Sequence, residues 1–447
     1  MQTKKNIAIA GAGLVGSLLA IYLKRQGHEV HVFDRSQDIR TIQFSGRSIN
    51  LVMSHRGWKA LETLGLQDEI KKIGIPVDKR AIHSKEGLLT YQNYGKDGEY
   101  IYSLSRGILN RKMIDLAEKE GVHFYFEQRI WDVDLPTATL FFGEDERGEW
   151  TPKTFDMAFG ADGAFSRIRH RMQRQSMFNY SQDFLKIGYK ELHIPANADG
   201  SYKIDKNSLH IWPRGNFMLM ALANLDGSFT CTLFMPNEGE NSFENLKDEA
   251  TLVSFFDTYF PDTKEVIPDL VRDFFKNPKS YLVTMKCFPW TFNDKVALIG
   301  DACHAIVPFY GHGMNAGFED ITVLNEMMIQ FGDDWEAVFK HYEQSRKPNA
   351  DAIAELSYRN FMEMSDKTAN PKFLLQKKIE QWFSAKHPDL WMPLYSRVTF
   401  SHQPYAEALS EGDRQNEIMQ EVLQMDDIEN RWNSDAVEAR IIALLKK

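Results

Sequence analysis

Three glycine-bearing segments, far apart in the sequence, carry the residues whose spacing could serve chemistry. The first is GAGLVG at 11–16, between an apolar run and a helical pattern. Its first glycine permits a tight turn, its second lets a pyrophosphate approach the backbone, and its third lets a helix pack on a strand. Asp34 follows a second apolar run and can bind an adenosine ribose. This arrangement predicts a dinucleotide site.

The other two segments place a carboxylate or a helix start after a predicted strand. GADG at 160–163 carries Asp162, and Ser166 can cap the helix that follows. Asp301 comes after the apolar run 296–299, where its carboxylate can accept sugar hydroxyls. Beyond it, the helix predicted from Met314 begins with free N–H groups that suit a cofactor that becomes anionic when reduced. The alternative is that these glycines only form turns.

The elements that must position these residues change character along the chain. Up to about residue 176 the pattern alternates strands and helices, which favours a Rossmann-like α/β fold. An antiparallel β-sheet domain is then predicted as an insertion, and a helical region closes the chain. The strands expected are 29–33, 80–84, 87–94, 100–104, 122–126, 155–159, 187–194, 208–212, 217–223, 228–236 and 281–288, and the helices are 56–64, 110–119, 241–279, 335–347, 351–364, 373–386 and 406–447.

Composition excludes several classes of protein. With 447 residues, 43% of them hydrophobic, the chain can bury more than one core. A net charge of −9 gives no attraction to nucleic acid. The three cysteines, Cys231, Cys287 and Cys303, lie too far apart to suggest a bridge or a metal site, which favours a reducing compartment.

Membrane insertion is not expected. Residues 7–23 have the apolar outline of a signal peptide or a short membrane span, but the glycine motif accounts for them. The charged tail lacks the run of about 18 apolar residues that a span requires.

Taken together, the three segments resemble the single-component flavin-dependent aromatic hydroxylases, and most closely the branch that acts on L-kynurenine. The resemblance covers nearly the whole chain in order. The stretches that carry it are GRSINLVMSHRG at 46–57, RAIHS at 80–84, YIYSLSR at 100–106, HIWPR at 210–214, TCTLFMP at 230–236, HAIVPFYGHGMNAGFED at 304–320 and MPLYSRVTF at 392–400.

The resemblance implies an organisation and a reaction. An FAD-binding domain would comprise 1–75, 101–176 and 284–365, a substrate-binding sheet domain 76–100 and 177–283, and a C-terminal helical region 366–447. FAD would be bound and NADPH would bind transiently. NADPH would reduce FAD, O₂ would form a flavin hydroperoxide, and its distal oxygen would be transferred to the ring of L-kynurenine.

Site residues are also implied, position by position. Arg80 and Tyr94 match the residues that hold the substrate's carboxylate, with Asn360 and Tyr395, although the pattern alone favours a surface arginine and a half-buried tyrosine. Phe234, Pro308 and Phe309 would line an aromatic slot. The implied FAD-binding set is Gly11, Gly13, Leu14, Val15, Gly16, Asp34, Arg35, Arg47, Leu51, Arg106, Ile130, Asp162, Asp301, Gly313, Met314 and Asn315. No side chain is expected to act as a catalytic acid or base, and no metal is expected.

Two residues depart from the family pattern, and the tail differs from that of many eukaryotic members. Cys303 stands where alanine is usual, and His312 replaces a glutamine. A histidine beside the flavin could titrate near neutral pH and alter the pH dependence. The membrane anchor of many eukaryotic members is missing from the tail, which predicts a soluble cytoplasmic enzyme.

Three alternatives stay open. The first is a related flavin hydroxylase acting on a phenolic or benzoic acid. The second is an NAD-dependent dehydrogenase that uses GAGLVG alone. The third is a flavin-binding protein without catalysis.

Overall fold

A six-stranded sheet organises the amino-terminal part of the computed structural model, which describes residues 3–42, 50–95, 98–363 and 371–446. Its strand order is β18-β19-β12-β1-β2-β8, and all neighbours are parallel except β18 and β19. The helices that pack against it include α1 (Leu14–Arg25), α4 (Arg106–Lys119) and α9 (Gly313–Phe331). The strands are β1 (Asn6–Ala10), β2 (Glu29–Phe33), β8 (His123–Tyr125), β12 (Met157–Gly160), β18 (Thr291–Phe292) and β19 (Val296–Leu298).

The central parallel strands β1, β12 and β19 are continuous apolar runs because both of their faces are buried. Ile7, Ala8 and Ile9, which are consecutive in β1, are fully buried. The carboxyl ends of four neighbouring strands lie at one edge, and each is followed by one of the predicted ligand-binding segments. The expected Rossmann-like α/β fold is confirmed.

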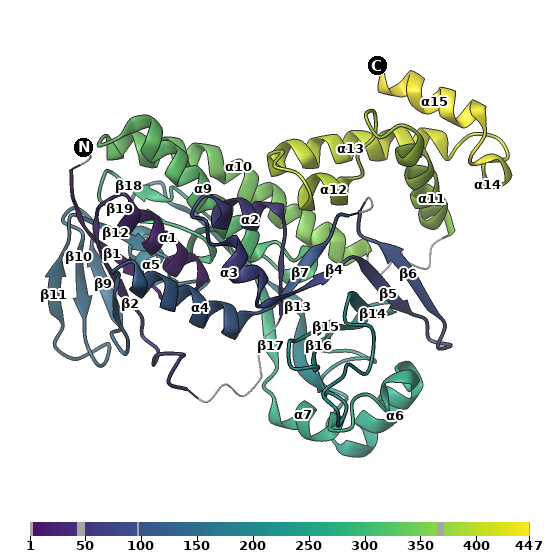
Figure 1. The fold of residues 1–447 in the computed structure, drawn as a ribbon, viewed down its shortest axis with the longest axis horizontal. Coiled ribbons are helices and arrows are strands. Elements are labelled where there is room, and N and C mark those ends of the chain that lie inside the picture. The colour runs from purple at the N-terminus through teal and green to yellow at the C-terminus, as the bar shows by residue number, and fades with distance from the viewer. Residues whose placement is uncertain (1–2, 43–49, 96–97, 364–370, 447) are drawn as a thin grey trace.

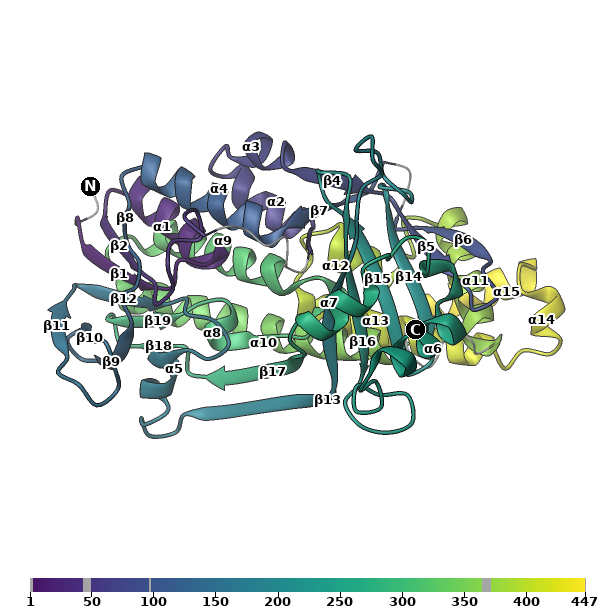
Figure 2. The ribbon, with the colours of Figure 1, turned by 90° about the horizontal axis from the view of Figure 1, so that it is seen from below.

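A seven-stranded sheet forms the second layer, in the order β17-β13-β16-β15-β14-β5-β6. Every pair is antiparallel except β5 and β14, which run parallel. Figure 2 shows β13 and β17 extending side by side as a long ribbon. The strands are β5 (Lys79–His83), β6 (Leu89–Asn93), β13 (Asn179–Ile194), β14 (Ser208–Arg214), β15 (Phe217–Ala223), β16 (Phe229–Pro236) and β17 (Ser280–Phe288).

Short helices cover one face of this sheet, below β15 and β16 in Figure 1. They are α6 (Glu249–Tyr259), the 3₁₀ turn η1 (Pro261–Thr263) and α7 (Leu270–Lys276). The expectation of one helical stretch over 241–279 is therefore wrong, because Pro261 and Pro268 interrupt the chain where a helix would need their N–H groups.

Two smaller sheets complete the β structure. One has the order β3-β7-β4, with β3 (Asn50–Met53), β4 (Gly74–Val77) and β7 (Ile101–Ser105). The other has the order β11-β10-β9, with β9 (Ile130–Asp134), β10 (Thr139–Phe142) and β11 (Thr151–Thr154), and it was not expected from the sequence.

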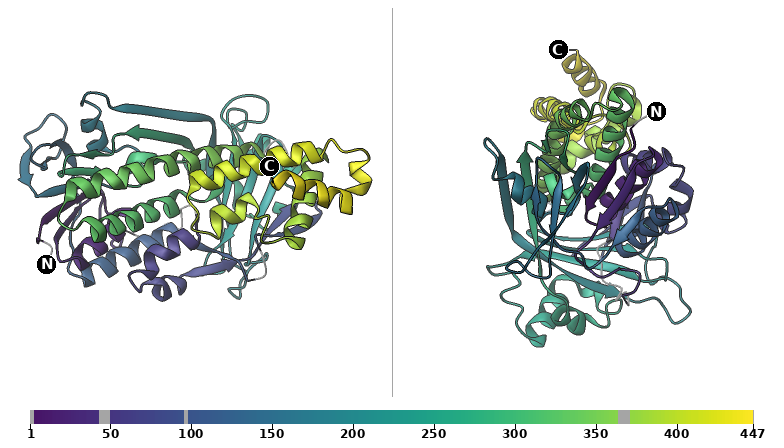
Figure 3. Two further views of the ribbon diagram at one scale, coloured as in Figure 1. Left: turned by 90° about the horizontal axis from the view of Figure 1, so that it is seen from above. Right: turned by 90° about the vertical axis from the view of Figure 1, so that its left-hand side faces the viewer.

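The carboxyl-terminal part is helical, as expected, but its first long helix is continuous. α10 runs from Trp335 to Met362 with Pro348 inside it, where two helices were predicted. Figure 3 shows α10 beside α9 and then beside α13, and packing along both sides holds the helix together despite the N–H group that Pro348 lacks. The remaining helices are α2 (His55–Glu62), α3 (Gln67–Lys71), α5 (Arg167–Met172), α8 (Asp301–His304), η2 (Pro308–Tyr310), α11 (Pro371–Lys386), α12 (Leu394–Thr399), α13 (Tyr405–Val422), α14 (Ile428–Arg431) and α15 (Asp435–Leu445).

The cysteines and the helix lengths agree with two further expectations. Cys231, Cys287 and Cys303 are buried and unpaired. Over the described ranges, no helix is at once long and apolar enough to cross a membrane.

Candidate active site

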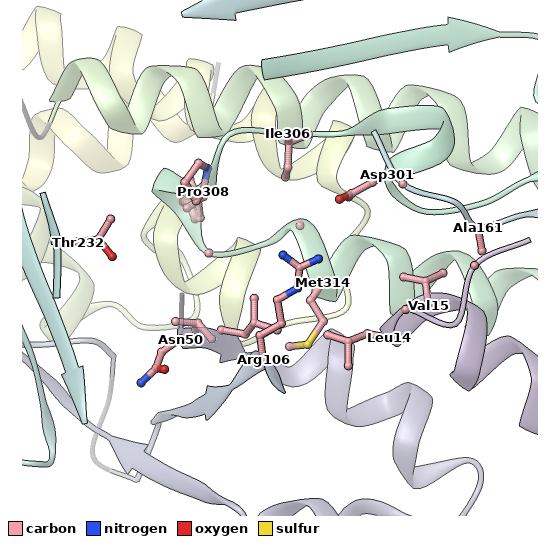
Figure 4. Close-up of a pocket in the computed structure, with 18 of the residues that line it drawn as sticks. Leu14, Val15, Asn50, Arg106, Ala161, Thr232, Asp301, Ile306, Pro308 and Met314 are labelled. Atoms are coloured by element: carbon pink, nitrogen blue, oxygen red, sulfur yellow. The ribbon is translucent and has the colours of Figure 1, made fainter. Parts of the chain in front are cut away.

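A cavity of about 510 Å³ lies between the carboxyl edge of the six-stranded sheet and the open face of the seven-stranded sheet. This volume falls within the range of about 300–1,000 Å³ that small-molecule sites occupy. Figure 4 shows Leu14, Val15 and Asp301 toward one end, Pro308 and Thr232 toward the other, and the Arg106 guanidinium pointing between them. The cavity is long enough to join residues from both sheets.

The GAGLVG turn opens the cavity to the start of α1. Gly11 has φ 107°, and a Cβ there would lie 2.4 Å from the Ala161 carbonyl oxygen. A Cβ on Gly13 would meet no protein atom within 4 Å, because this position faces open space in the cavity. A Cβ on Gly16 would lie 2.0 Å from the Gly11 oxygen, so Gly16 serves packing and does not line the cavity.

Asp34 stands at the end of β2 and holds the same turn. Its Oδ2 accepts the Ala12 N–H at 2.8 Å, and its Oδ1 accepts the Ser36 N–H at 2.8 Å. Both oxygens keep a second lone pair, and Asp34 and Arg35 line the cavity. The carboxylate can therefore accept further hydroxyl protons from a ligand.

The GADG segment contributes a buried carboxyl group with one unused oxygen. Asp162 Oδ2 accepts the Arg167 N–H at 2.7 Å, whereas Oδ1 has no hydrogen-bond partner within the described structure. Burial raises the pKa of Asp162 above its usual value. The predicted cap is confirmed, since the Ser166 hydroxyl accepts the Arg169 N–H at 2.9 Å.

The third segment brings a second helix start to the cavity. Gly313 and Met314 begin α9 and line the cavity, and no side chain caps this helix. Gly317 lets α9 approach α1 closely, because a Cβ there would lie 2.6 Å from Val15 Cγ2. Two uncapped helix N-termini therefore face the same space, and neither has an acidic residue in its first turn.

These features fit a flavin dinucleotide. The open space at Gly13 allows a pyrophosphate to reach the backbone, and the α1 N-terminus favours an anion. The unpaired Asp162 Oδ1 is a buried acceptor that lacks a donor. The α9 N-terminus supplies positive potential farther along the cavity.

At the other end, one arginine is enclosed by tyrosines. The Arg80 guanidinium carbon lies 4.7 Å from the Tyr94 ring centroid and 4.6 Å from that of Tyr395. Tyr395 also stacks on Tyr310, with centroids 5.5 Å apart. Among the residues that the structure describes, no carboxylate lies within 4.0 Å of the Arg80 side-chain nitrogens. Arg80 is not the surface residue that the pattern alone favoured.

An aromatic wall lies beside the arginine. The rings of Phe234 and Phe309 are 5.2 Å apart, and Phe309 lies 4.4 Å from Phe361. Asn360 Nδ2 donates to the Phe309 carbonyl at 2.7 Å, which ties the end of α10 to η2. This part of the cavity can hold a flat ring.

The cavity brings together most of the predicted site residues. It is lined by Arg80, Tyr94, Asn360, Tyr395, Phe234, Phe309 and Pro308, and by Gly11, Gly13, Leu14, Val15, Asp34, Arg35, Leu51, Arg106, Ile130, Asp162, Asp301, Gly313 and Met314. Arg47 lies outside the described residues. Gly16 and Asn315 do not line the cavity.

The side chain of Asn315 does not line the cavity. It is fully buried, its Nδ2 donates to the carbonyls of Val52 at 2.7 Å and Gly311 at 3.0 Å, and its Oδ1 accepts the Ser54 N–H at 2.9 Å. Its amide joins β3 to the loop before α9 instead of facing a ligand.

The expectation that His312 titrates near neutral pH beside the flavin is also wrong. His312 does not line the cavity, and it is fully buried between the hydroxyls of Tyr405, 2.8 Å from Nδ1, and Thr399, 3.3 Å from Nε2. Burial lowers its pKa to about 3. The ring is neutral at physiological pH.

A buried cluster of a cysteine, a histidine and an aspartate near α8 and α9 is not suited to bind a metal ion. Ligand atoms of Cys303, His304 and Asp320 lie within 4.8 Å of one another. Arg346 Nε, however, donates to Asp320 Oδ1 at 2.8 Å, and burial raises the pKa of the Cys303 thiol well above its usual value. A guanidinium and a neutral thiol do not favour a cation.

Sequence reasoning missed several lining residues. Thr230 and Thr232 share the period-2 face of β16 with Phe234, so strand alternation could have identified them. Tyr310, Arg129 and Arg167 carried no comparable signal.

Known proteins match this chain over most or all of its length. A family model described as "FAD binding domain" matches residues 4–357. Kynurenine 3-monooxygenase of Flavobacterium johnsoniae is 71% identical over 447 residues, which cover 100% of both chains. The same enzyme of Flavobacterium psychrophilum is 69% identical over 445 residues, covering 100% of this chain and 99% of the relative. That of Myxococcus xanthus is 44% identical over 452 residues, covering 99% and 97%.

Solved structures share the fold at low sequence identity. The tetrameric form of 2-methyl-3-hydroxypyridine-5-carboxylic acid oxygenase superposes with a TM-score of 0.68 at 19% identity, covering 84% of this chain and 96% of that one. PqsL of Pseudomonas aeruginosa, in complex with 2-aminobenzoylacetate, gives 0.65 at 20% identity, covering 81% and 97%. By its full-length identity to the curated relatives and its match to the FAD binding domain model, the chain belongs to the kynurenine 3-monooxygenase family.

Proposed function

We propose that this chain is an FAD-dependent monooxygenase that converts L-kynurenine to 3-hydroxykynurenine and consumes NADPH and O₂. The observation that carries the proposal is one cavity that joins two glycine-rich helix starts to Arg80, an arginine that has no carboxylate partner among the described residues. The names of the full-length relatives support the same activity. The cavity does not favour the phenolic-acid alternative over kynurenine.

The FAD-binding end offers groups suited to each part of the cofactor. The backbone at Gly13 would receive the pyrophosphate, and Asp34 would accept the adenosine ribose hydroxyls. The Arg106 guanidinium reaches the middle of the cavity, Asp301 lies toward the end that holds Leu14 and Val15, and the N–H groups at Gly313 and Met314 would stabilise negative charge. FAD, when bound, supplies the redox chemistry and the activation of O₂.

The substrate end would bind the amino acid by its charged group and its ring. Arg80 would form a bidentate pair with the carboxylate, and the hydroxyls of Tyr94 and Tyr395 would fix its angle. Phe234 and Phe309 would hold the ring, and the apolar wall would exclude water from the reacting atoms. Asn360, whose amide is tied to the Phe309 carbonyl, would orient that wall.

The domain division and the cellular location belong to the same proposal. An FAD-binding domain of 1–75, 101–176 and 284–365 would hold one end of the cavity, and a sheet domain of 76–100 and 177–283 the other, with 366–447 as the helical region. The acidic composition and the three unpaired cysteines support a soluble cytoplasmic enzyme. Recovery mainly in washed membranes after high-speed centrifugation would contradict it.

The deciding experiment is turnover by the purified, yellow protein. NADPH oxidation should accelerate with L-kynurenine and yield 3-hydroxykynurenine, and hydroxybenzoates should give no hydroxylated product. Hydroxylation of a benzoic acid without any reaction on kynurenine would refute the proposal.

A further inference from the structure

A second polar cluster lies on the seven-stranded sheet, on the face away from the cavity. His83 ends β5, His210 lies in the neighbouring strand β14, and Asp262 comes from η1. Adjacent residues of a strand face opposite sides, so β5 directs Arg80 to the cavity, and His83 lies against Trp212 in the core on the other face of the sheet. The cluster therefore sits directly behind the strand that carries the arginine.

The cluster is a chain of three hydrogen bonds. Asp262 Oδ2 lies 2.8 Å from His83 Nδ1, His83 Nε2 lies 2.9 Å from His210 Nδ1, and His210 Nε2 lies 2.8 Å from the Asp205 carbonyl oxygen. The same Asp262 oxygen accepts the Trp212 Nε1–H at 2.7 Å. Both histidines are buried, with 9% and 1% of their surface exposed.

The number of protons in this series of hydrogen bonds follows from the acceptors at its two ends. A carboxylate and a carbonyl oxygen are both acceptors, so each ring nitrogen that faces an end must carry a proton. The contact between the two rings needs a third proton. Two neutral imidazoles carry only two, and with two protons one of the three contacts would place lone pairs against each other at hydrogen-bond distance.

We propose that His83 and His210 together hold three protons, with the additional one on His83 beside Asp262, and that this charged pair is a positioning element for Arg80. The proposal deepens the proposed function and rests on it for the role of Arg80. Asp262 balances the charge, and the two rings join the end of β5 to the first half of β14.

The surroundings of the two histidines agree with a third proton on His83. Burial lowers the pKa of His210 to about 4, which makes it the neutral member of the pair. Burial alone would raise the pKa of Asp262, but the bonds from His83 and Trp212 bring it below its usual value. The His83 ring stacks on Trp212 with centroids 4.0 Å apart. The charged and titratable groups around the pair are Asp262, Asp205, Arg214, which donates to the His83 carbonyl at 2.9 Å, Lys79, which pairs with Asp205, and Glu86.

A kinetic consequence follows from the charge of Asp262. Removing that charge takes away the third proton of the pair, so one contact is left without a hydrogen and the end of β5 loosens. The KM for L-kynurenine should then rise, while bound FAD stays unchanged.

The first arm of the test counts protons in the FAD-loaded, ¹⁵N-histidine-labelled chain. At pH 6.5, both ring nitrogens of His83 and at least one of His210 should carry protons, assigned by the loss of signals in His83→Gln and His210→Gln. Only two ring protons over the pair would overturn the proposal. This arm is independent of the substrate.

The second arm compares KM for L-kynurenine at pH 6.5 in the parent enzyme and in Asp262→Asn. The variant keeps an acceptor oxygen but removes the charge, so its KM should be about 3- to 10-fold higher than that of the parent, the worth of one buried hydrogen bond. Its kcat and FAD content should stay near the parent values. His123→Gln removes an exposed histidine paired with Glu29 and serves as the control, with the parent KM expected.

An Asp262→Asn KM equal to that of the parent would overturn the positioning role. Absence of any kynurenine turnover by the parent would instead overturn the proposed function, and the proton count would still decide whether the pair is charged.

Discussion

Replacing Arg80 by methionine tests the proposed carboxylate site most directly. The guanidinium lies between the rings of Tyr94 and Tyr395 at 4.7 and 4.6 Å. No carboxylate of the described chain pairs with it, so a substrate carboxylate would be its ion-pair partner. Methionine fills similar apolar space between the rings without the charge.

The magnitude follows from leaving a substrate anion unpaired in a largely desolvated pocket. Such a truncation costs about 2–5 kcal/mol, which is roughly 30- to 5,000-fold in kcat/KM. Arg80→Lys should recover only part of this loss, because a point charge does not reproduce the planar fork. Tyr94→Phe removes one hydroxyl and should cost about 0.5–3 kcal/mol.

The assay is steady-state NADPH oxidation with L-kynurenine and with an analogue that lacks the carboxylate. The analogue should react poorly with the parent enzyme and lose little more in Arg80→Met, because both changes remove the same interaction. FAD content should stay at the parent level. As a control, Arg272→Met removes an arginine whose side chain is 58% exposed, and its kinetics should match the parent. Unchanged kynurenine kinetics in Arg80→Met, or full additivity with the analogue, would refute the reasoning.

Four further substitutions give separate outcomes. Gly13→Val should leave the fold intact, because a Cβ at this position meets no protein atom within 4 Å, but it should abolish copurification of FAD, because the side chain occupies the pyrophosphate space. Gly16→Ala should instead lower Tm, because a Cβ there clashes with the Gly11 oxygen. Stoichiometric FAD in purified Gly13→Val would contradict this expectation. Burial lowers the pKa of His312 to about 3, so the ring is neutral in the folded chain, whereas in the unfolded chain it protonates at about pH 6.5. Between pH 7.5 and pH 5 the unfolding free energy of the parent should therefore fall by about 2 kcal/mol more than that of His312→Gln. Urea denaturation at the two pH values measures this difference. Burial alone would raise the pKa of Asp320, but His304 and Arg346 lower it below its usual 3.8, so the carboxylate's contribution to folding stability is complete above that pH. Asp320→Asn should therefore lower the unfolding free energy by about 3–5 kcal/mol, equally at pH 7 and pH 5. A loss of stability that vanishes at pH 5 would argue against the ion pair.

Much of the fold follows from local patterns. Continuous apolar runs identified the buried strands, and the bounds expected for β2 and β15 agree with the structure. Prolines explain two of the errors in opposite ways. Pro261 and Pro268 break the predicted helix over 241–279, whereas Pro348 stays inside α10 because helices on both sides compensate for its missing hydrogen bond.

Site residues were predictable where a motif fixes the backbone or where the family resemblance extends. Gly13 and Asp34 face the cavity as expected, but Asn315, from the same segment as Met314, turns into the protein to bind β3. A residue's position in a motif does not fix the direction of its side chain, because packing around the helix start decides it.

The sequence by itself determined which segments could bind a dinucleotide, because glycine spacing and apolar periodicity act over a few neighbouring residues. Only the tertiary structure decided which of these segments meet. β5 lies parallel to β14, although more than a hundred residues separate them, and this pairing places His83 against His210 and Arg80 in the cavity. Tyr395 reaches Arg80 from a helix near the end of the chain. Contacts of this kind depend on burial and on the pairing of distant strands, which no local pattern encodes.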